Sequence, residues 1–148
     1  MSARFETIHA SVVLVGEHAV IIRGPSGSGK SKLALALLDA AKSGLLPYAK
    51  LVADDRVRIF AAHGRLVVSA PETISGMVEV HGLGIRAADC EPMAVAEWIV
   101  DLSAKDAARM PELSSAEIFG VTISRLPVGA GQDPLPILLA ALTTAPKG

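Results

Sequence analysis

Gly24-Pro25-Ser26-Gly27-Ser28-Gly29-Lys30-Ser31 (GPSGSGKS) fits the pattern G-x-x-x-x-G-K-[ST] at every fixed position. Glycines in this pattern let the chain turn back so that successive backbone N–H groups point at phosphate oxygens. The ammonium of Lys30 is predicted to reach the β- and γ-phosphates of a bound ligand, and the hydroxyl of Ser31 is predicted to bind Mg²⁺. The motif therefore predicts a phosphate-binding loop formed by this whole stretch.

The segments on either side of the motif supply the context that such a loop requires. Two apolar runs rich in β-branched residues, Ser11–Val15 and Ala19–Arg23, precede it and are separated by a turn containing Gly16. Such a pair predicts a β-hairpin, which here leads directly into the loop. After the loop, apolar residues recur at helical spacing over residues 30–43, and Gly44 suits the end of a helix.

The remainder of the chain is predicted to form mainly short strands. The segment 94–102 is ambiguous between helix and strand, and strand is favoured because Pro92 and Asp101 bound it closely. The last apolar segment predicts a closing helix that begins with a proline in its first turn. The strands are expected at 51–53, 56–60, 65–69, 77–81 and 121–124, and the closing helix at 136–142. The pattern indicates an α/β protein.

Length and composition limit the possible classes of protein. The 148 residues favour one domain over 1–148, and 51% hydrophobic residues are enough for one core. Because 14 basic residues face 15 acidic residues, no bulk positive charge is present for nucleic-acid binding. No apolar run approaches the ~18 residues of a membrane-spanning helix. The single cysteine, Cys90, fits a reducing compartment, so the cytoplasm is expected.

A pair of carboxylates follows the loop along the chain. Asp54 and Asp55 end the predicted strand 51–53, and ligands of α/β folds bind at the carboxyl ends of strands. Phosphoryl transfer needs an acidic group to hold Mg²⁺ or to activate the nucleophile. The pair therefore predicts a metal ligand and a catalytic base, the alternative being an Asp-rich turn that opens a hairpin.

The order of several motifs resembles the catalytic domain of the HPr kinase/phosphorylase family. The resemblance rests on these segments: His9–Gly24 (HASVVLVGEHAVIIRG), Leu51–Asp55 (LVADD), Gly76–Ile85 (GMVEVHGLGI), Val100–Leu113 (VDLSAKDAARMPEL) and Leu126–Leu142 (LPVGAGQDPLPILLAAL). It implies a mixed sheet of the HPr kinase/PEP carboxykinase-like type, in which a β-hairpin leads into the phosphate loop. It also implies rings of six subunits.

The function implied by this resemblance is the ATP-dependent phosphorylation of a serine on HPr, the phosphocarrier protein of a phosphotransferase system. Asp55 would be the base that takes the serine proton, and Lys30 would stabilise the transferred phosphoryl group. Glu79 would join Ser31, with Asp54 beside them, in holding Mg²⁺. His9 and Arg109 would be additional active-site residues.

Three features depart from the family pattern. His81 stands where the family signature has an arginine, and the segment after Gly84 is shorter. The closing loop reads PVGAGQD, so Gly129 and Gln132 replace both arginines of the family's PVRPGRN. Because an attacking inorganic phosphate should need such cationic donors, the kinase reaction is expected to be retained and the reverse phosphorolysis to be weak or absent.

Two other functions remain open from the sequence. One is a P-loop kinase for a small molecule, against which the hairpin before the loop argues. The other is a nucleotide-binding regulator without catalysis that docks on phosphotransferase proteins. The destination of the γ-phosphate, a carrier protein, a metabolite or neither, distinguishes the three.

Overall fold

The computed structural model describes residues 5–71, 75–107 and 114–144. Two helices are present in these segments, α1 (Lys30–Lys42) and α2 (Pro134–Thr143). The strands are β1 (Glu6–Ile8), β2 (Ser11–Val15), β3 (His18–Arg23), β4 (Ala49–Ala53), β5 (Val57–Ala62), β6 (Arg65–Ser69), β7 (Met77–Val80), β8 (Gly84–Ala87), β9 (Met93–Leu102), β10 (Ser114–Ile118) and β11 (Val121–Val128).

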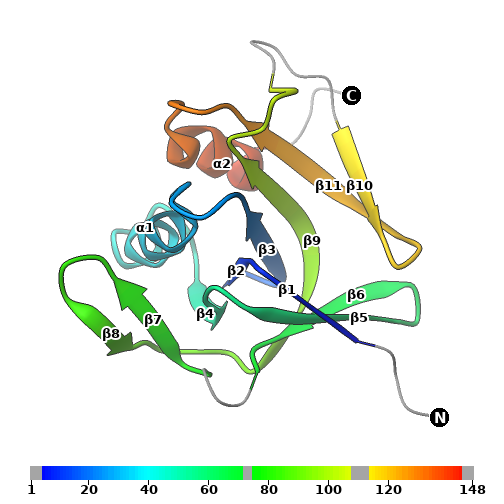
Figure 1. The fold of residues 1–148 in the computed structure, drawn as a ribbon, viewed down its shortest axis with the longest axis horizontal. Coiled ribbons are helices and arrows are strands. Elements are labelled where there is room, and N and C mark those ends of the chain that lie inside the picture. Colours follow the sequence, from blue (N-terminus) through cyan, green and yellow to red (C-terminus); the bar gives the residue numbers. More distant parts are fainter. Residues whose placement is uncertain (1–4, 72–74, 108–113, 145–148) are drawn as a thin grey trace.

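Most of the strands belong to one mixed sheet that curls strongly (Figure 1). Its order is β1-β5-β6-β9-β3-β2-β4, with β11 also paired to β9 and β10 to β11. Strands β3, β9 and β11 run parallel, whereas β2 is antiparallel to both β3 and β4. The carboxyl ends of the three parallel strands therefore meet at one edge, where β3 leads into the glycine-rich loop 24–31.

Two apolar cores lie on opposite faces of this sheet. On one face, Val20 and Ile22 of β3 pack with residues of α1 and α2. On the other face, Ala19 and Ile21 pack with residues of β5 and β6, because the sheet folds over itself. A strand that is covered on both faces consists of consecutive apolar residues, which explains the sequence AVII at residues 19–22 of β3.

Both predicted helices are present: α1 ends one residue earlier than expected, whereas α2 begins at Pro134, two residues before the expected start at 136. Helix α1 ends at Lys42, and Gly44 follows its cap Ser43 in the left-handed conformation, with φ of 81°. Helix α2 has proline in its first turn and is capped by the Asp133 side chain, which accepts from the backbone N–H of Leu135. Neither helix of the described segments has the length and apolarity needed to cross a lipid bilayer.

Most predicted elements are confirmed, and the ambiguous segment 94–102 belongs to strand β9. Three strands were not expected. Strand β1 is only three residues long. Strand β8 is exposed at every position, and β10 has a polar sequence, SSAEI, that pairs with β11. None of these three carries the apolar alternation by which a strand is recognised.

Candidate functional site

The glycine-rich loop 24–31 turns at two left-handed glycines. Gly27 has φ of 80° and Gly29 has φ of 101°, a region that other residues rarely enter. A turn bond from the N–H of Ser28 to the carbonyl of Pro25, 3.0 Å long, lies between Gly24 and Gly29. Gly24 is needed for space, because a Cβ there would collide with Ser28 Oγ and lie 3.0 Å from Leu102 Cβ. The conformation thus depends on all three glycines.

The amino-terminal end of α1 breaks two ordinary rules of helix stability. No side chain caps it, and its first turn contains no acidic residue. It carries Lys30 and Lys32 instead, although the amino-terminal end of a helix is the positive end of its dipole. Uncapped N–H groups together with positive charge form a site suited to an anion such as phosphate.

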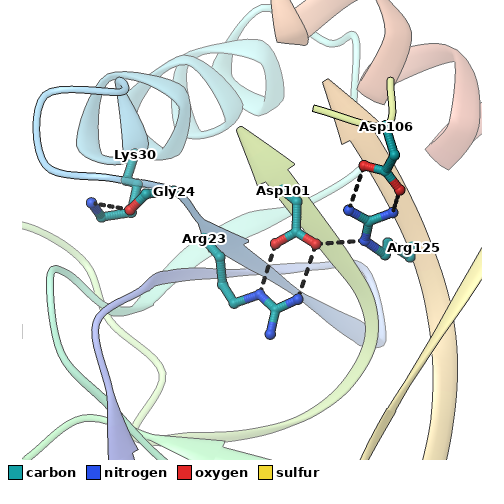
Figure 2. A network of polar contacts seen from close by, with 6 residues as sticks. All are labelled: Arg23, Gly24, Lys30, Asp101, Asp106 and Arg125. Carbon is teal, nitrogen blue, oxygen red and sulfur yellow. Dashed lines mark hydrogen bonds and ion pairs between the residues drawn. The ribbon is translucent and has the colours of Figure 1, made fainter. Parts of the chain in front are cut away.

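Lys30 lies folded back over the loop. Its Nζ donates to the carbonyl of Gly24 at 3.0 Å (Figure 2). It also donates to the carbonyl of Pro25 at 3.3 Å. Among the described residues no carboxylate pairs with this ammonium. Its positive charge is therefore available to a ligand at the mouth of the loop.

Asp54 is a buried carboxylate, 6% exposed, directly after β4. Its Oδ1 accepts from Ser31 Oγ at 2.6 Å and from Ser11 Oγ at 2.8 Å. Its Oδ2 accepts from the backbone N–H of Glu79 at 3.1 Å. One side chain thus joins β2, the start of α1 and β7. A buried carboxylate is tolerated when it is hydrogen-bonded in this way.

The neighbouring Asp55 has a constrained backbone and an exposed side chain. Its φ is 69°, and the N–H of Arg56 donates to the carbonyl of Asp54 at 2.9 Å across it, as in a three-residue turn. Its own N–H donates to Ser11 Oγ at 3.3 Å, and its carbonyl accepts from Ala10 at 3.1 Å. A non-glycine residue held in this conformation is frequent at functional sites.

A cleft of about 500 Å³ connects these groups. It is lined by Ser26, Gly27, Gly29, Lys30, Ser31, Lys32, Leu35, Asp55, Glu79, Val80 and His81. A smaller cleft of about 300 Å³ lies beside it and shares Asp55 and Glu79. Cations from the loop therefore face carboxylates from β7 and from the turn after β4 across one space.

The oxygen donors near Ser31 fit magnesium. Mg²⁺ is commonly held by one or two carboxylates, with phosphate oxygens and water completing its shell. Ser31 Oγ and the Asp54 carboxylate are adjacent, and Glu79 lines the same cleft. Among the described residues no three His, Cys, Asp or Glu side chains converge on a metal position. The donor set therefore fits an ion that shares its ligands with phosphate, and not a closed protein site.

The structure brings together most of the residues expected from the sequence, but not all of them. His9 is exposed and does not line the cleft, although its neighbour Ala10 contacts Asp55. Arg109 lies outside the described residues. Sequence reasoning missed Ser11, whose hydroxyl contacts both Asp54 and Asp55. The available signal was a polar residue at the start of an apolar strand.

A network of ion pairs lies beside the loop, at the ends of the parallel strands (Figure 2). Asp101 of β9 accepts from Arg23 Nε at 2.7 Å and Nη2 at 2.9 Å, and from Arg125 Nε at 2.6 Å. Arg125 of β11 also donates to both oxygens of Asp106, at 2.7 and 3.1 Å. The residue before Gly24 is thus tied to β9 and, through Asp101, to β11.

The same network changes the acidity of its members. Burial alone would raise the pKa of Asp101, but hydrogen bonds and charge from Arg23 and Arg125 outweigh burial and lower it. The hydrogen bond from Arg125 lowers the pKa of Asp106. Hydrogen bonds to Asp106 and Asp101 raise the pKa of Arg125 above its ordinary value. The network is therefore fully charged at neutral pH.

Comparison with known proteins identifies the family. The model of the HPr serine kinase C-terminal domain matches residues 2–89 of the chain. These residues are more than half of the chain and include the glycine-rich loop, Asp54, Asp55 and Glu79. The chain belongs to this family. Arg109 and the closing loop 127–133 lie beyond the matched residues.

Individual relatives agree with this assignment. The HPr kinase/phosphorylase of Clostridium tetani is 42% identical over 78 residues, which are 53% of this chain and 23% of that protein. The HPr kinase/phosphorylase of Lactobacillus acidophilus is 34% identical over 84 residues, 56% of this chain and 24% of that protein. The matched region thus spans about a quarter of the length of these relatives.

A solved structure extends the comparison to the whole fold. The HPr(Ser) kinase/phosphatase from Coxiella burnetii superposes with a TM-score of 0.75 and covers 93% of each chain. Its sequence is 22% identical to this chain. The match shows that the mixed α/β fold with its curled sheet is shared.

Proposed function

We propose that this chain is an ATP- and Mg²⁺-dependent kinase that phosphorylates a serine on an HPr-type phosphocarrier protein. The observation that carries the proposal is the uncapped, lysine-bearing start of α1 facing Asp55 and Glu79 across one cleft. Phosphoryl transfer needs positioning, positive charge around the moving phosphoryl group and a base for the nucleophile. The cleft offers groups for each of these tasks.

The roles of the residues follow from their places. The backbone N–H groups of loop 24–31 and the ammonium of Lys30 hold the phosphates. Ser31 and Asp54 hold Mg²⁺ with help from Glu79, and the bound ion supplies charge neutralisation on the phosphate oxygens. Asp55 takes the proton from the hydroxyl of the substrate serine, since its carboxylate is exposed to the cleft. The serine oxygen bonds to the γ-phosphorus of ATP as the bond from that phosphorus to the bridging oxygen breaks, and ADP leaves.

His9 and Arg109 are proposed as accessory residues on the resemblance to the family. His9 is one residue from Ala10, whose N–H contacts the Asp55 carbonyl. A role in orienting the turn that holds Asp55 therefore fits its place. For Arg109 the proposed role is additional positive charge at the transferred phosphoryl group.

A protein acceptor is favoured over a metabolite by the surface beside Asp55. Met77, Leu83 and Ile85 of the β7–β8 hairpin are exposed, Ile85 by 71%. Met77 and Ile85 line the smaller cleft together with Asp55 and Glu79. Exposed apolar side chains gathered at one place are typical of a surface that meets another protein.

The deciding experiment is phosphorylation in vitro of the HPr protein from the same organism, with ATP labelled in the γ-phosphate. Label should appear on a single serine of HPr, mapped by mass spectrometry, and should disappear with the Lys30→Ala variant. Label on a metabolite would indicate the small-molecule kinase. Nucleotide binding with no turnover in the presence of HPr would indicate the regulator without catalysis.

We further propose that the reverse reaction is weak. The loop after β11 carries no cation between Val128 and Asp133. The Gln132 side chain instead closes the loop on itself by accepting from the N–H of Gly129 at 2.6 Å. Serine-phosphorylated HPr incubated with the protein, Mg²⁺ and excess phosphate should release little pyrophosphate. Rapid release would contradict this part of the proposal.

The proposal also covers the cellular compartment and the number of subunits. We expect the chain to act as one catalytic unit in the cytoplasm, since Cys90 is a free thiol. The resemblance to the family implies a ring of six subunits. Sedimentation of the purified protein tests this number directly.

A further inference from the structure

Ser11 is a buried residue without a role in the proposed reaction. Among the residues that the structure describes, only two polar ones are buried, Ser11 and Asp54. Ser11 is fully enclosed at the start of β2, and Val12 and Val13 after it belong to the two apolar cores. A hydroxyl in such a place costs free energy unless its hydrogen bonds are made. Its burial therefore points to a task other than packing.

The Ser11 hydroxyl contacts both aspartates, once as a donor and once as an acceptor. It donates to Asp54 Oδ1 at 2.8 Å, and it accepts from the backbone N–H of Asp55 at 3.3 Å. A serine hydroxyl has one proton and two lone pairs, so the two bonds can form at the same time. Ser11 thus connects the side chain of one aspartate to the backbone of the other.

The backbone of Asp55 is held on both sides by residues 10 and 11. Its N–H donates to Ser11 Oγ, and its carbonyl accepts from the N–H of Ala10 at 3.1 Å. Its φ of 69° is a conformation that a non-glycine residue keeps only when the surroundings enforce it. The Ser11 hydroxyl is therefore one of the contacts that fix the direction in which the Asp55 side chain leaves the backbone.

The other end of this connection reaches the proposed metal site. Asp54 Oδ1, the oxygen that accepts from Ser11, also accepts from Ser31 Oγ at 2.6 Å. We propose that Ser11 is a positioning residue, whose hydroxyl fixes the proposed base Asp55 relative to the Ser31–Asp54 pair that would hold Mg²⁺. The inference rests on the proposed kinase function and adds to it a residue that acts only through the two aspartates.

Removal of the hydroxyl should affect the two aspartates differently. Asp54 keeps two donors, Ser31 Oγ and the N–H of Glu79, so its carboxylate stays in place but is less well oriented. Asp55 loses the acceptor of its N–H. Groups that orient a metal ligand contribute roughly 10–100-fold to metal affinity or activity, and a displacement of about 1 Å can cost roughly 10²-fold in rate. A loss of rate and a loss of magnesium affinity should therefore appear together.

Three substitutions of Ser11 separate the hydroxyl from the space that it fills. Ser11→Ala removes the hydroxyl, Ser11→Cys fills the same place with a weak donor, and Ser11→Thr keeps the hydroxyl on a side chain suited to a strand. Val68→Ala is the matched control, because Val68 of β6 is equally enclosed and lines neither cleft that contains Asp55. It measures the effect of lost core packing alone. Thermal unfolding shows that each variant is folded.

Two kinds of measurement are made on the folded variants. Steady-state kinetics gives kcat and KM for HPr. Titration calorimetry with ATP, in Mg²⁺ and in a chelator, gives the factor by which Mg²⁺ tightens ATP binding, without any turnover of HPr. We expect Ser11→Ala and Ser11→Cys to lower both kcat and this factor by about tenfold, with KM for HPr unchanged. Ser11→Thr should keep both near the wild-type values, and Val68→Ala should lower Tm alone.

Wild-type values of kcat and of the magnesium factor in Ser11→Ala and Ser11→Cys would overturn the inference and leave the proposed kinase in place. Equal losses in Ser11→Thr would also overturn it, because the hydroxyl would then not be the cause. A wild-type protein that binds ATP equally well without Mg²⁺ and transfers no label to HPr would overturn the proposed function itself. The two kinds of failure are thus distinct.

Discussion

Asp54 and Asp55 are neighbours in the sequence with opposite environments. Asp54 is buried and accepts three hydrogen bonds, whereas Asp55 is exposed with φ of 69°. The left-handed turn is what separates them, because it sends one side chain toward Ser31 and the other into the cleft. The proposed roles, a metal ligand at Asp54 and a base at Asp55, need such different surroundings, and one backbone angle provides both.

The base assignment predicts the effect of Asp55→Asn. The amide keeps the size of the side chain but cannot take a proton, and general bases contribute roughly 10²–10⁴-fold to rate. We expect kcat for HPr phosphorylation to fall by about that factor, with ATP affinity and the free energy of unfolding nearly unchanged. Steady-state kinetics measures kcat, titration calorimetry measures the affinity for ATP, and urea denaturation measures the free energy of unfolding. Full activity in the variant would show that another group accepts the proton.

Ser11 shows where residue-level prediction from sequence stops. The motif GPSGSGKS and the pair of aspartates are local patterns, so they could be recognised in the sequence. Ser11 lies 43 positions from Asp54, and its contact exists only because β2 pairs with β4. The network of Arg23, Asp101 and Arg125 was missed for the same reason, since Arg23 and Asp101 are 78 positions apart.

At the scale of elements, the ends of β3, β9 and β11 are held by one carboxylate. Asp101 joins Arg23 and Arg125, and Arg23 is followed by the first glycine of the loop. Replacement of Asp101 by Asn leaves the guanidinium groups of Arg23 and Arg125 with an uncharged partner. We expect Asp101→Asn to lower the free energy of unfolding at pH 7 by about 1–3 kcal/mol, measured by urea denaturation.

The wild-type protein and the Asp101→Asn variant should also differ in how their stability responds to acid. The folded-state pKa of Asp101 lies below its unfolded value, so its stabilisation is present above about pH 4 and is lost as the pH falls through the lowered pKa. Wild-type protein should therefore lose more stability than Asp101→Asn between pH 7 and pH 3. Parallel losses in the two proteins would contradict a stabilising role for the ionised carboxylate.

The β7–β8 hairpin gives a second prediction at this scale. Ile85 is 71% exposed and lines the smaller cleft with Asp55. A charge at this position should disfavour contact with HPr, and we expect Ile85→Glu to raise KM for HPr at least about tenfold, which is about 1.4 kcal/mol. ATP affinity and stability should stay the same. Leu45→Glu, at an exposed apolar residue after α1, is the matched control.

For the whole molecule, the fold was more predictable than the connections within it. The strands β2, β3, β5, β6 and β9 and both helices follow from apolar periodicity and turn residues. The sequence cannot show that β9 lies between β3 and β11, or that the sheet curls to enclose a second core. Those features depend on which strands pair, and pairing is decided by packing across the whole chain.

Nucleotide binding should be visible as a gain in global stability. A ligand that binds only the folded state at 100 times its dissociation constant adds about 2.7 kcal/mol, which for a domain of this size is about 5–10 °C in Tm. Mg²⁺ with ATP should produce this shift in thermal unfolding. Lys30→Ala should show little shift, and removal of Mg²⁺ with a chelator should reduce the shift in the wild type.

The lysines at the uncapped start of α1 also have a practical consequence for work with the purified protein. Lys30 donates to carbonyls of its own loop, and the first turn of the helix contains no acidic side chain. Sulfate or phosphate in a buffer would enter this position and compete with nucleotide. Apparent ATP affinity should thus depend on which anion the buffer contains, even at constant ionic strength, so chloride and sulfate solutions would give different constants for the same molecule.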